Sequence, residues 1–258
     1  MVRAVAANNS RICLRISSRL RQIRARLCRT LRGEPSRLFV VMVLLSTPGF
    51  AQTKTPTAIE LVLALDSSAS VDGREFRLQI EGIALAFKDP EVQQAIDNLK
   101  PFGAAIAITQ WGATGETHVV VPFTLVENGR DSKAFGFRAG LITRWIRASA
   151  TSIATGINDA RILILNNEFD GQRKVIDVSG DGQDNGRESL ADARDQALIA
   201  GITINGLPIS AEDKTLADYY ETKVISGADS FSEPANGFED FARAIKEKLL
   251  RELRPLGS

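Results

Sequence analysis

The chain has 258 residues, of which 44% are hydrophobic and 24% are charged, a composition typical of a globular protein that buries a core without disulfides. Its net charge of +1 averages two unlike segments: residues 1–37 carry ten arginines and one acid, whereas residues 52–258 carry 22 basic and 30 acidic residues. A net charge of about −8 makes the second segment a poor candidate for binding nucleic acid or an anionic membrane surface. We expect no nucleic-acid partner and no stable membrane span in the mature chain.

Residues 1–51 predict an export signal preceded by a basic extension. The apolar stretch LFVVMVLLSTPGFA at 38–51 is too short for a comfortable membrane span and is interrupted by Pro48 and Gly49. Basic residues, an apolar stretch and then small residues are typical of a secretory signal peptide, with cleavage near Ala51/Gln52. The long basic region is explained either by a start codon assigned too far upstream or by a role of its own. We expect a bacterial protein that is periplasmic or secreted.

Both cysteines, Cys13 and Cys28, lie in the segment that cleavage would remove. The mature chain would then have no disulfide, no thiolate nucleophile and no thiolate metal ligand. It contains one histidine, His118, and neither a GxSxG nor an HExxH motif. Hydrolase chemistry is therefore disfavoured, and we expect a protein that is not an enzyme.

Alternating strand and helix patterns predict one domain at 58–253, between a short linker at 52–57 and a C-terminal tail at 254–258. Continuous apolar runs indicate buried strands, and apolar residues at helical spacing indicate amphipathic helices. In chain order we predict a strand at 59–65, helices at 73–88 and 90–99, strands at 103–111 and 117–126, helices at 132–147 and 152–167, a strand at 174–180, a helix at 187–200, a strand at 202–209, a helix at 214–223, a short strand within 224–233 and a helix at 238–251.

This alternation predicts a doubly wound α/β fold with a mostly parallel central sheet and helices on both faces. Only a few polar or small residues separate the strands at 103–111 and 117–126, so we expect them to form one antiparallel hairpin. Pro122 places the second of these strands at the edge of the sheet, because proline cannot donate a ladder hydrogen bond.

Oxygen-bearing side chains gather where the predicted strands and helices end. Asp66 follows the first strand, and Ser68 and Ser70 come after it at alternating positions. Thr151 stands just before a helix, and Asp181 just after a buried strand. Ligands bind outside the carboxyl ends of the strands in such sheets, and carboxylate and hydroxyl oxygens suit Mg²⁺, Ca²⁺ or Mn²⁺. Each residue alone also fits a cap or a turn, and it is the combination that favours a metal site.

The motif Asp66-Ser67-Ser68-Ala69-Ser70 matches the DxSxS signature of von Willebrand factor A domains. Thr151 stands where that family has its threonine, and Asp181 is followed by a glycine as in the family's late Asp-Gly pair. Over about residues 58–253 the chain resembles this family, and more narrowly a bacterial secreted or periplasmic family of unknown function related to it. Ser149-Ala150 stands where many relatives have glycines, and Gly180 where they often have a threonine, which leaves the geometry of those loops open.

The resemblance implies a Rossmann-like fold and a metal-ion-dependent adhesion site (MIDAS). In such a site Ser68, Ser70 and Thr151 would ligate the cation, and Asp66 and Asp181 would act directly or through water. The resemblance favours Mg²⁺, with Mn²⁺ or Ca²⁺ as alternatives. It also implies a protein partner that supplies an acidic group to the metal, and no catalytic step.

The main alternative is a phosphatase of the haloacid dehalogenase type. Those enzymes also begin with an aspartate after an apolar strand, and they carry a late acidic motif similar to GDGQDN at 180–185, with Lys174 ahead of it. They normally have a second carboxylate two residues after the first, and here that position is Ser68. Phosphoryl transfer through Asp66 would therefore lack its proton donor.

The surroundings of two further aspartates, Asp177 and Asp184, can also be predicted from their positions. Asp177 lies within the strand at 174–180, and a buried carboxylate requires a partner, which the sequence does not name. Asp184 and its neighbour Asn185 are expected in a solvated loop rather than in support of the site.

Overall fold

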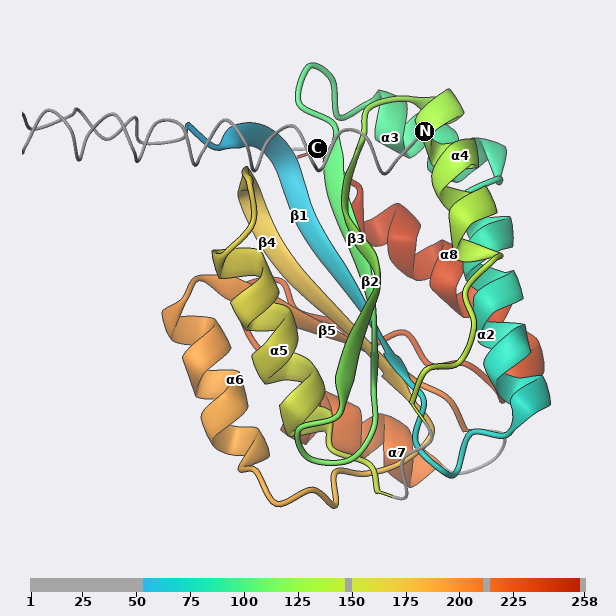
Figure 1. Ribbon diagram of the computed structural model, residues 1–258, viewed down its shortest axis with the longest axis vertical. Coiled ribbons are helices and arrows are strands. Elements are labelled where there is room, and N and C mark those ends of the chain that lie inside the picture. Colours follow the sequence, from blue (N-terminus) through green and yellow to red (C-terminus); the bar gives the residue numbers. More distant parts are fainter. Residues whose placement is uncertain (1–52, 147–149, 211–213, 256–258) are drawn as a thin grey trace, which may run out of the picture. The chain divides into compact units, whose positions relative to one another are not determined.

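A five-stranded sheet in the order β3-β2-β1-β4-β5 organises the computed structural model (Figure 1). β2, β1, β4 and β5 run parallel, and β3 pairs antiparallel with β2 at one edge. The strands are β1 (Thr55–Asp66), β2 (Ala104–Trp111), β3 (Thr117–Val126), β4 (Phe169–Gly180) and β5 (Ile202–Pro208). The structure describes residues 53–146, 150–210 and 214–255, so the predicted basic extension and signal peptide at 1–51 lie outside the described residues.

Helices cover both faces of the sheet (Figure 1). One face carries α2 (Gly73–Ala86), α3 (Pro90–Asp97), α4 (Gly129–Ala139), the 3₁₀ turn η2 (Phe238–Asp240) and α8 (Phe241–Glu252). The other face carries α5 (Ile153–Leu165), α6 (Leu190–Ile199), α7 (Lys214–Tyr219) and the π-helical turn η1 (Tyr220–Val224). The predicted doubly wound α/β fold with one antiparallel edge hairpin is confirmed. No helix in the described ranges is long and apolar enough to cross a membrane.

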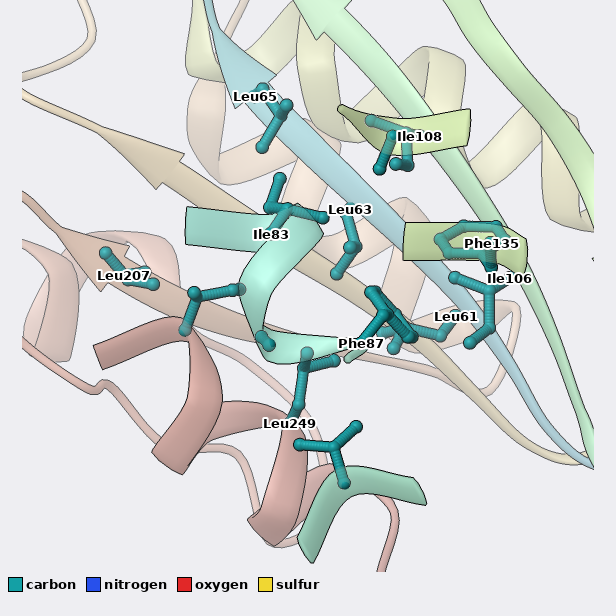
Figure 2. Close-up of a cluster of buried hydrophobic side chains, with 14 of the residues drawn as sticks. Leu61, Leu63, Leu65, Ile83, Phe87, Ile106, Ile108, Phe135, Leu207 and Leu249 are labelled. Atoms are coloured by element: carbon teal, nitrogen blue, oxygen red, sulfur yellow. The ribbon is translucent and has the colours of Figure 1, made fainter. Parts of the chain in front are cut away.

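The two hydrophobic cores follow from the alternation of side chains along the central strand β1. Leu61, Leu63 and Leu65 point to the face of α2, where they pack with Ile83 and Phe87 (Figure 2). Val62 and Ala64, at the intervening positions, belong to the core on the face of α5. Both sides of β1 are buried, which is why its sequence reads as a continuous apolar run rather than as an alternation.

Two strands are longer than the apolar runs that predict them. β1 begins at Thr55, inside the predicted linker, because Thr55 is in register with Phe169 of an equally extended β4. The buried carboxylate of Glu60 supports this extension by accepting hydrogen bonds from Asn167 Nδ2 and from the backbone N of Gly171. The polar residues of the extension have no apolar signature, and therefore only the tertiary pairing identifies them as strand.

Helix boundaries differ from the periodicity in three places. α4 begins three residues early, since the Asn128 side chain accepts hydrogen bonds from two free backbone N–H groups, and it ends at Ala139 instead of 147. α6 begins at Leu190, capped by Ser189, rather than at 187. The segment predicted to hold a last strand forms single bridges, such as that between Ser226 and Ile204.

The partner of Asp177 is Lys248, from the buried side of α8. Lys248 Nζ lies 3.1 Å from Asp177 Oδ1 and 2.8 Å from Glu252 Oε1, and all three side chains are at most 2% exposed. The contact with Asp177 is an ion pair of poor hydrogen-bond alignment, whereas the bond to Glu252 is well formed. One buried ammonium is thus shared by two buried carboxylates, a cluster that joins β4 to α8.

Candidate functional site

The five predicted metal ligands come from three loops at the carboxyl end of the sheet, at the bottom of the view in Figure 1. Asp66 is the last residue of β1 and is fully buried. Ser68 and Ser70 lie in the turn that leads to α2, where Asp72 caps the helix. Thr151 and Asp181 come from the loop before α5 and the loop after β4.

Hydrogen bonds connect the side chains of these loops into one chain. The Ser70 hydroxyl donates to Asp181 Oδ1 at 2.7 Å, and its oxygen lies 3.0 Å from that of Ser68. The Thr151 hydroxyl donates to Ser68 Oγ at 3.2 Å. The backbone N of Ser68 donates to Asp66 Oδ1 at 2.7 Å. All five predicted residues are therefore neighbours in space, although up to 115 positions separate them in sequence.

One of the two oxygens of the Asp66 carboxylate accepts no hydrogen bond from the described residues. Oδ2 is buried and has no hydrogen-bond partner among the described residues. Burial, with a contribution from nearby Asp181, raises the pKa of Asp66 to about 7, although the hydrogen bonds from Ser68 act in the opposite direction. An ionised buried carboxylate with a free oxygen is costly unless a cation compensates it, and this is the feature that best fits a metal ion.

Gly180 and Tyr220 form the wall behind Asp66. A Cβ atom at Gly180 would lie 2.9 Å from Asp66 Oδ2 and 2.8 Å from the Tyr220 hydroxyl, so a larger residue such as threonine has no room here. The Tyr220 hydroxyl is buried without a hydrogen-bond partner among the described residues, and burial followed by nearby Asp66 raises its pKa well above the usual value. The sequence analysis missed Tyr220, because nothing in its local sequence signals proximity to Asp66.

The loop after β4 is anchored on Thr151. The Asn185 side chain accepts a hydrogen bond from the Thr151 backbone N, and the Asn185 backbone N donates to the Thr151 carbonyl, both at 2.8 Å. Asp184 Oδ1 accepts a hydrogen bond from Ala154 N in the first turn of α5. Asn185 is exposed and Asp184 is half-buried, so the loop is solvated as expected, but both residues also hold two of the site loops together.

Arg144 fixes the loop that carries the two serines. Its guanidinium donates to the carbonyls of Ser68 at 2.6 Å, Val71 at 2.7 Å and Ser67 at 2.9 Å. Gln110, near the end of β2, positions the arginine by donating to the Thr143 carbonyl and accepting from the Trp145 backbone N. The sequence placed Arg144 inside a helix that in fact ends at Ala139, and for that reason its role was missed.

Replacing Arg144 with methionine is expected to weaken cation binding by about 10- to 100-fold, the usual effect of removing a group that orients metal ligands. The three carbonyls would lose their common donor, and Ser68 and Ser70 would no longer be held in place. Titration calorimetry with Mg²⁺ measures the change. Arg138→Met is the matched control, since this exposed arginine of α4 donates its hydrogen bond to Thr124 of β3 and none to a carbonyl of the site loops in the described ranges. Equal affinities in the two variants would contradict the role of Arg144.

The donor set is that of a hard divalent cation. Three hydroxyls and two carboxylates are oxygen ligands of the kind that Mg²⁺ takes, and two aspartates balance the charge of one such ion. Within the described ranges, no cluster of three or more His, Cys, Asp or Glu could hold a metal. A site at Asp66 would therefore depend on its hydroxyls, and its residues fit the predicted ion.

The site offers little for phosphoryl transfer or acyl transfer. Lys174 is in register with Glu60, toward the amino end of β1, whereas Asp66 is at the carboxyl end of that strand. His118 is on the edge strand β3 and stacks on Trp145, with ring centroids 4.4 Å apart. None of the hydrogen bonds among Ser68, Ser70, Thr151 and Asp181 in the described part of the chain involves a histidine.

Comparisons with known proteins give a family and a fold. Residues 56–256 match the family described as "Protein of unknown function (DUF1194)". A comparison with curated proteins finds no match.

Several solved structures share the fold at low identity. Proximal thread matrix protein 1 from the mussel byssus is 15% identical with a TM-score of 0.55, over 78% of this chain and 47% of that one. A structure of the same mussel protein described as having a zinc-occupied MIDAS motif has a TM-score of 0.55 at 14% identity, over 79% and 48%. A von Willebrand factor type A protein from Catenulispora acidiphila is 18% identical with a TM-score of 0.52, over 76% and 43%. The pilus adhesin SpaC from Lactobacillus rhamnosus GG is 11% identical with a TM-score of 0.52, over 78% and 30%. This chain spans less than half the length of each of them.

Proposed function

The chain belongs to the DUF1194 family and has the von Willebrand A fold, and from this premise we propose that it is a divalent-cation-dependent protein-binding module without catalytic activity. One observation carries the proposal. The hydroxyls of Ser68, Ser70 and Thr151 form a continuous hydrogen-bonded chain with Asp181, beside the unpartnered buried oxygen of Asp66. This is a compact group of oxygens at the edge of the sheet where such folds bind ligands.

Each residue has a defined part in the proposal. Ser68, Ser70 and Thr151 hold the ion through their hydroxyls, and Asp66 and Asp181 balance its charge directly or through water. The ion is Mg²⁺, with Mn²⁺ or Ca²⁺ as alternatives. When bound, it offers a positively charged coordination position to an acidic oxygen of a protein partner.

The similar structures support this assignment in general terms. One of them is a pilus adhesin, and another is a matrix protein whose MIDAS motif holds zinc. The proposal includes export of the chain to the periplasm or beyond, with cleavage near Ala51/Gln52, on the evidence of the basic and apolar segments before that point.

Titration calorimetry of Mg²⁺, Mn²⁺ and Ca²⁺ into the purified protein tests the proposal. We expect saturable binding of one ion and loss of that binding in Asp181→Ala. The absence of saturable binding by any of the three ions would sink the metal-dependent part of the proposal. Hydrolysis of p-nitrophenyl phosphate that disappears in Asp66→Asn would replace the binding module with the phosphatase.

A further inference from the structure

A pocket of about 520 Å³ lies at the amino ends of β4 and β5, beside the last turn of α8. It is at the opposite end of the sheet from Asp66 and Asp181, and β4 begins at the top of the sheet in Figure 1. We call it the basic pocket, because its lining includes three arginines: Arg173, Arg251 and Arg254.

The charge of the basic pocket is not balanced by its acids. Asp229 and Glu252 also line it, but Glu252 is already bonded to Lys248 at 2.8 Å and to Asn205 at 2.9 Å. Lys174 lies 3.4 Å from Asp170, and within the described ranges the three arginines form no ion pair with a carboxylate. Such an excess of positive charge is unexpected in a segment whose net charge is about −8.

Two of the arginines are held in fixed positions. The Arg251 guanidinium lies 3.7 Å from the centroid of the Phe231 ring, a cation–π contact that orients its fork. Arg173 donates from Nη2 to the Arg254 carbonyl at 2.8 Å, while its Nε is buried without a hydrogen-bond partner in the described part of the chain. Burial also lowers the pKa of Arg173, which means that its charge is incompletely compensated.

The helix dipole explains only part of this cluster. Arg251 is in the last turn of α8, where a cation is favourable beside the free carbonyls. Arg173 comes from β4 and gains nothing from that dipole. A separate reason is needed for placing its charge on the wall of a cavity.

We propose that the basic pocket binds a small organic oxyanion, a carboxylate or a phosphate, between Arg173, Arg251 and Arg254. The planar guanidinium group of arginine binds carboxylates and phosphates through paired, charge-assisted hydrogen bonds. The Nε of Arg173 is a donor without an acceptor in the described part of the chain. The Phe231 ring supplies an apolar wall, and the volume is within the range of small-molecule sites. This site is independent of the metal site at the other end of β4.

Titration calorimetry of the full chain at constant ionic strength tests the proposal, with citrate, inorganic phosphate and pyrophosphate as probes. We expect one of them to bind saturably with a stoichiometry of one, and to bind at least about tenfold more weakly to Arg173→Gln and Arg251→Gln, which each lose a charge-assisted contact. Arg254→Gln, at an exposed position of the pocket lining, gives the same test if one of these two variants fails to fold. A preference for citrate or for pyrophosphate identifies the carboxylate or the phosphate as the ligand group.

Arg77→Gln is the matched control, because Arg77 is an exposed arginine of α2 away from the pocket. Its affinity is expected to equal that of the unmodified chain, and Asp66→Ala is expected to bind the anion equally well. Equal weakening in Arg77→Gln, unchanged affinity in the pocket variants, or no saturable binding of any probe would overturn the proposal.

Discussion

Replacing Asp66 with alanine is expected to abolish binding of the divalent cation while the domain stays folded. The site would lose half of its carboxylate charge, together with a buried oxygen that has no hydrogen-bond partner among the described residues. The fold would lose only the hydrogen bond from the Ser68 backbone N, worth about 1 kcal/mol, and it would be relieved of a carboxyl group whose burial is unfavourable. Calorimetric titration with Mg²⁺ and a thermal melt of the metal-free protein measure the two effects separately.

Asp195→Ala provides the comparison for this variant. Asp195 is an exposed aspartate of α6, and its removal changes the net charge equally without touching the site. Retained Mg²⁺ affinity in Asp66→Ala, or an equal loss in Asp195→Ala, would show that the cation binds elsewhere. An unfolded Asp66→Ala would show instead that Asp66 serves the structure.

Replacing Lys248 with methionine is expected to cost about 3–5 kcal/mol of unfolding free energy at neutral pH, the usual effect of breaking a buried ion pair. Methionine fills a similar volume, so the loss comes from the charges rather than from a cavity. Asp177 and Glu252 would remain as two carboxylates in a dry interior, with no ammonium between them. Urea denaturation at pH 7.5 measures the difference, and a loss below about 1 kcal/mol would contradict the account of a shared ammonium.

The pH dependence of the unfolding free energy provides a second test of the cluster formed by Asp177, Lys248 and Glu252. Burial, with Glu252 nearby, raises the pKa of Asp177 from 3.8 to about 7, although Lys248 acts in the opposite direction. Between these values the folded protein holds a proton that the unfolded chain has released, so this group's contribution to stability is full below pH 3.8 and is lost as the pH rises to about 7.

Asp177→Asn should remove that decline and leave a matched pair of Lys248 and Glu252. We expect its unfolding free energy between pH 4 and 7 to be flatter than that of the unmodified protein. Urea denaturation at several pH values in this range checks the slope. An unchanged slope would mean that Asp177 does not hold the proton.

The sequence predicts the fold well because its strongest signals are local. The apolar run at 59–65 and the helical spacing around Ile80 and Ile83 depend on near neighbours, and they identify β1 and α2 correctly. The proximity of Asp66, Thr151 and Asp181 is predictable for a related reason: parallel strands bring their carboxyl ends to one edge of the sheet.

The parts that sequence reasoning missed all depend on distant pairing. Arg144 reaches carbonyls of residues more than 70 positions earlier, and Tyr220 meets Asp66 only once η1 packs against β5. The burial of Lys248 is detectable in the sequence, because this lysine lies among Ala244, Ile245 and Leu249 on the apolar side of its helix. A lysine on a buried helix face and an aspartate within a buried strand are best interpreted together, as an internal pair.

The hydrogen-bonded chain from Asp181 through Ser70 and Ser68 to Thr151 has a consequence for the speed and cost of ion exchange. The conformational entropy of assembling three loops is lost when the domain folds, so little of it would remain to be lost when the proposed ion binds. Arg144 and Asn185 keep those loops assembled through backbone atoms that a cation would not displace. The protein is therefore expected to exchange ions at a rate limited by the departure of water from the ion rather than by loop motion.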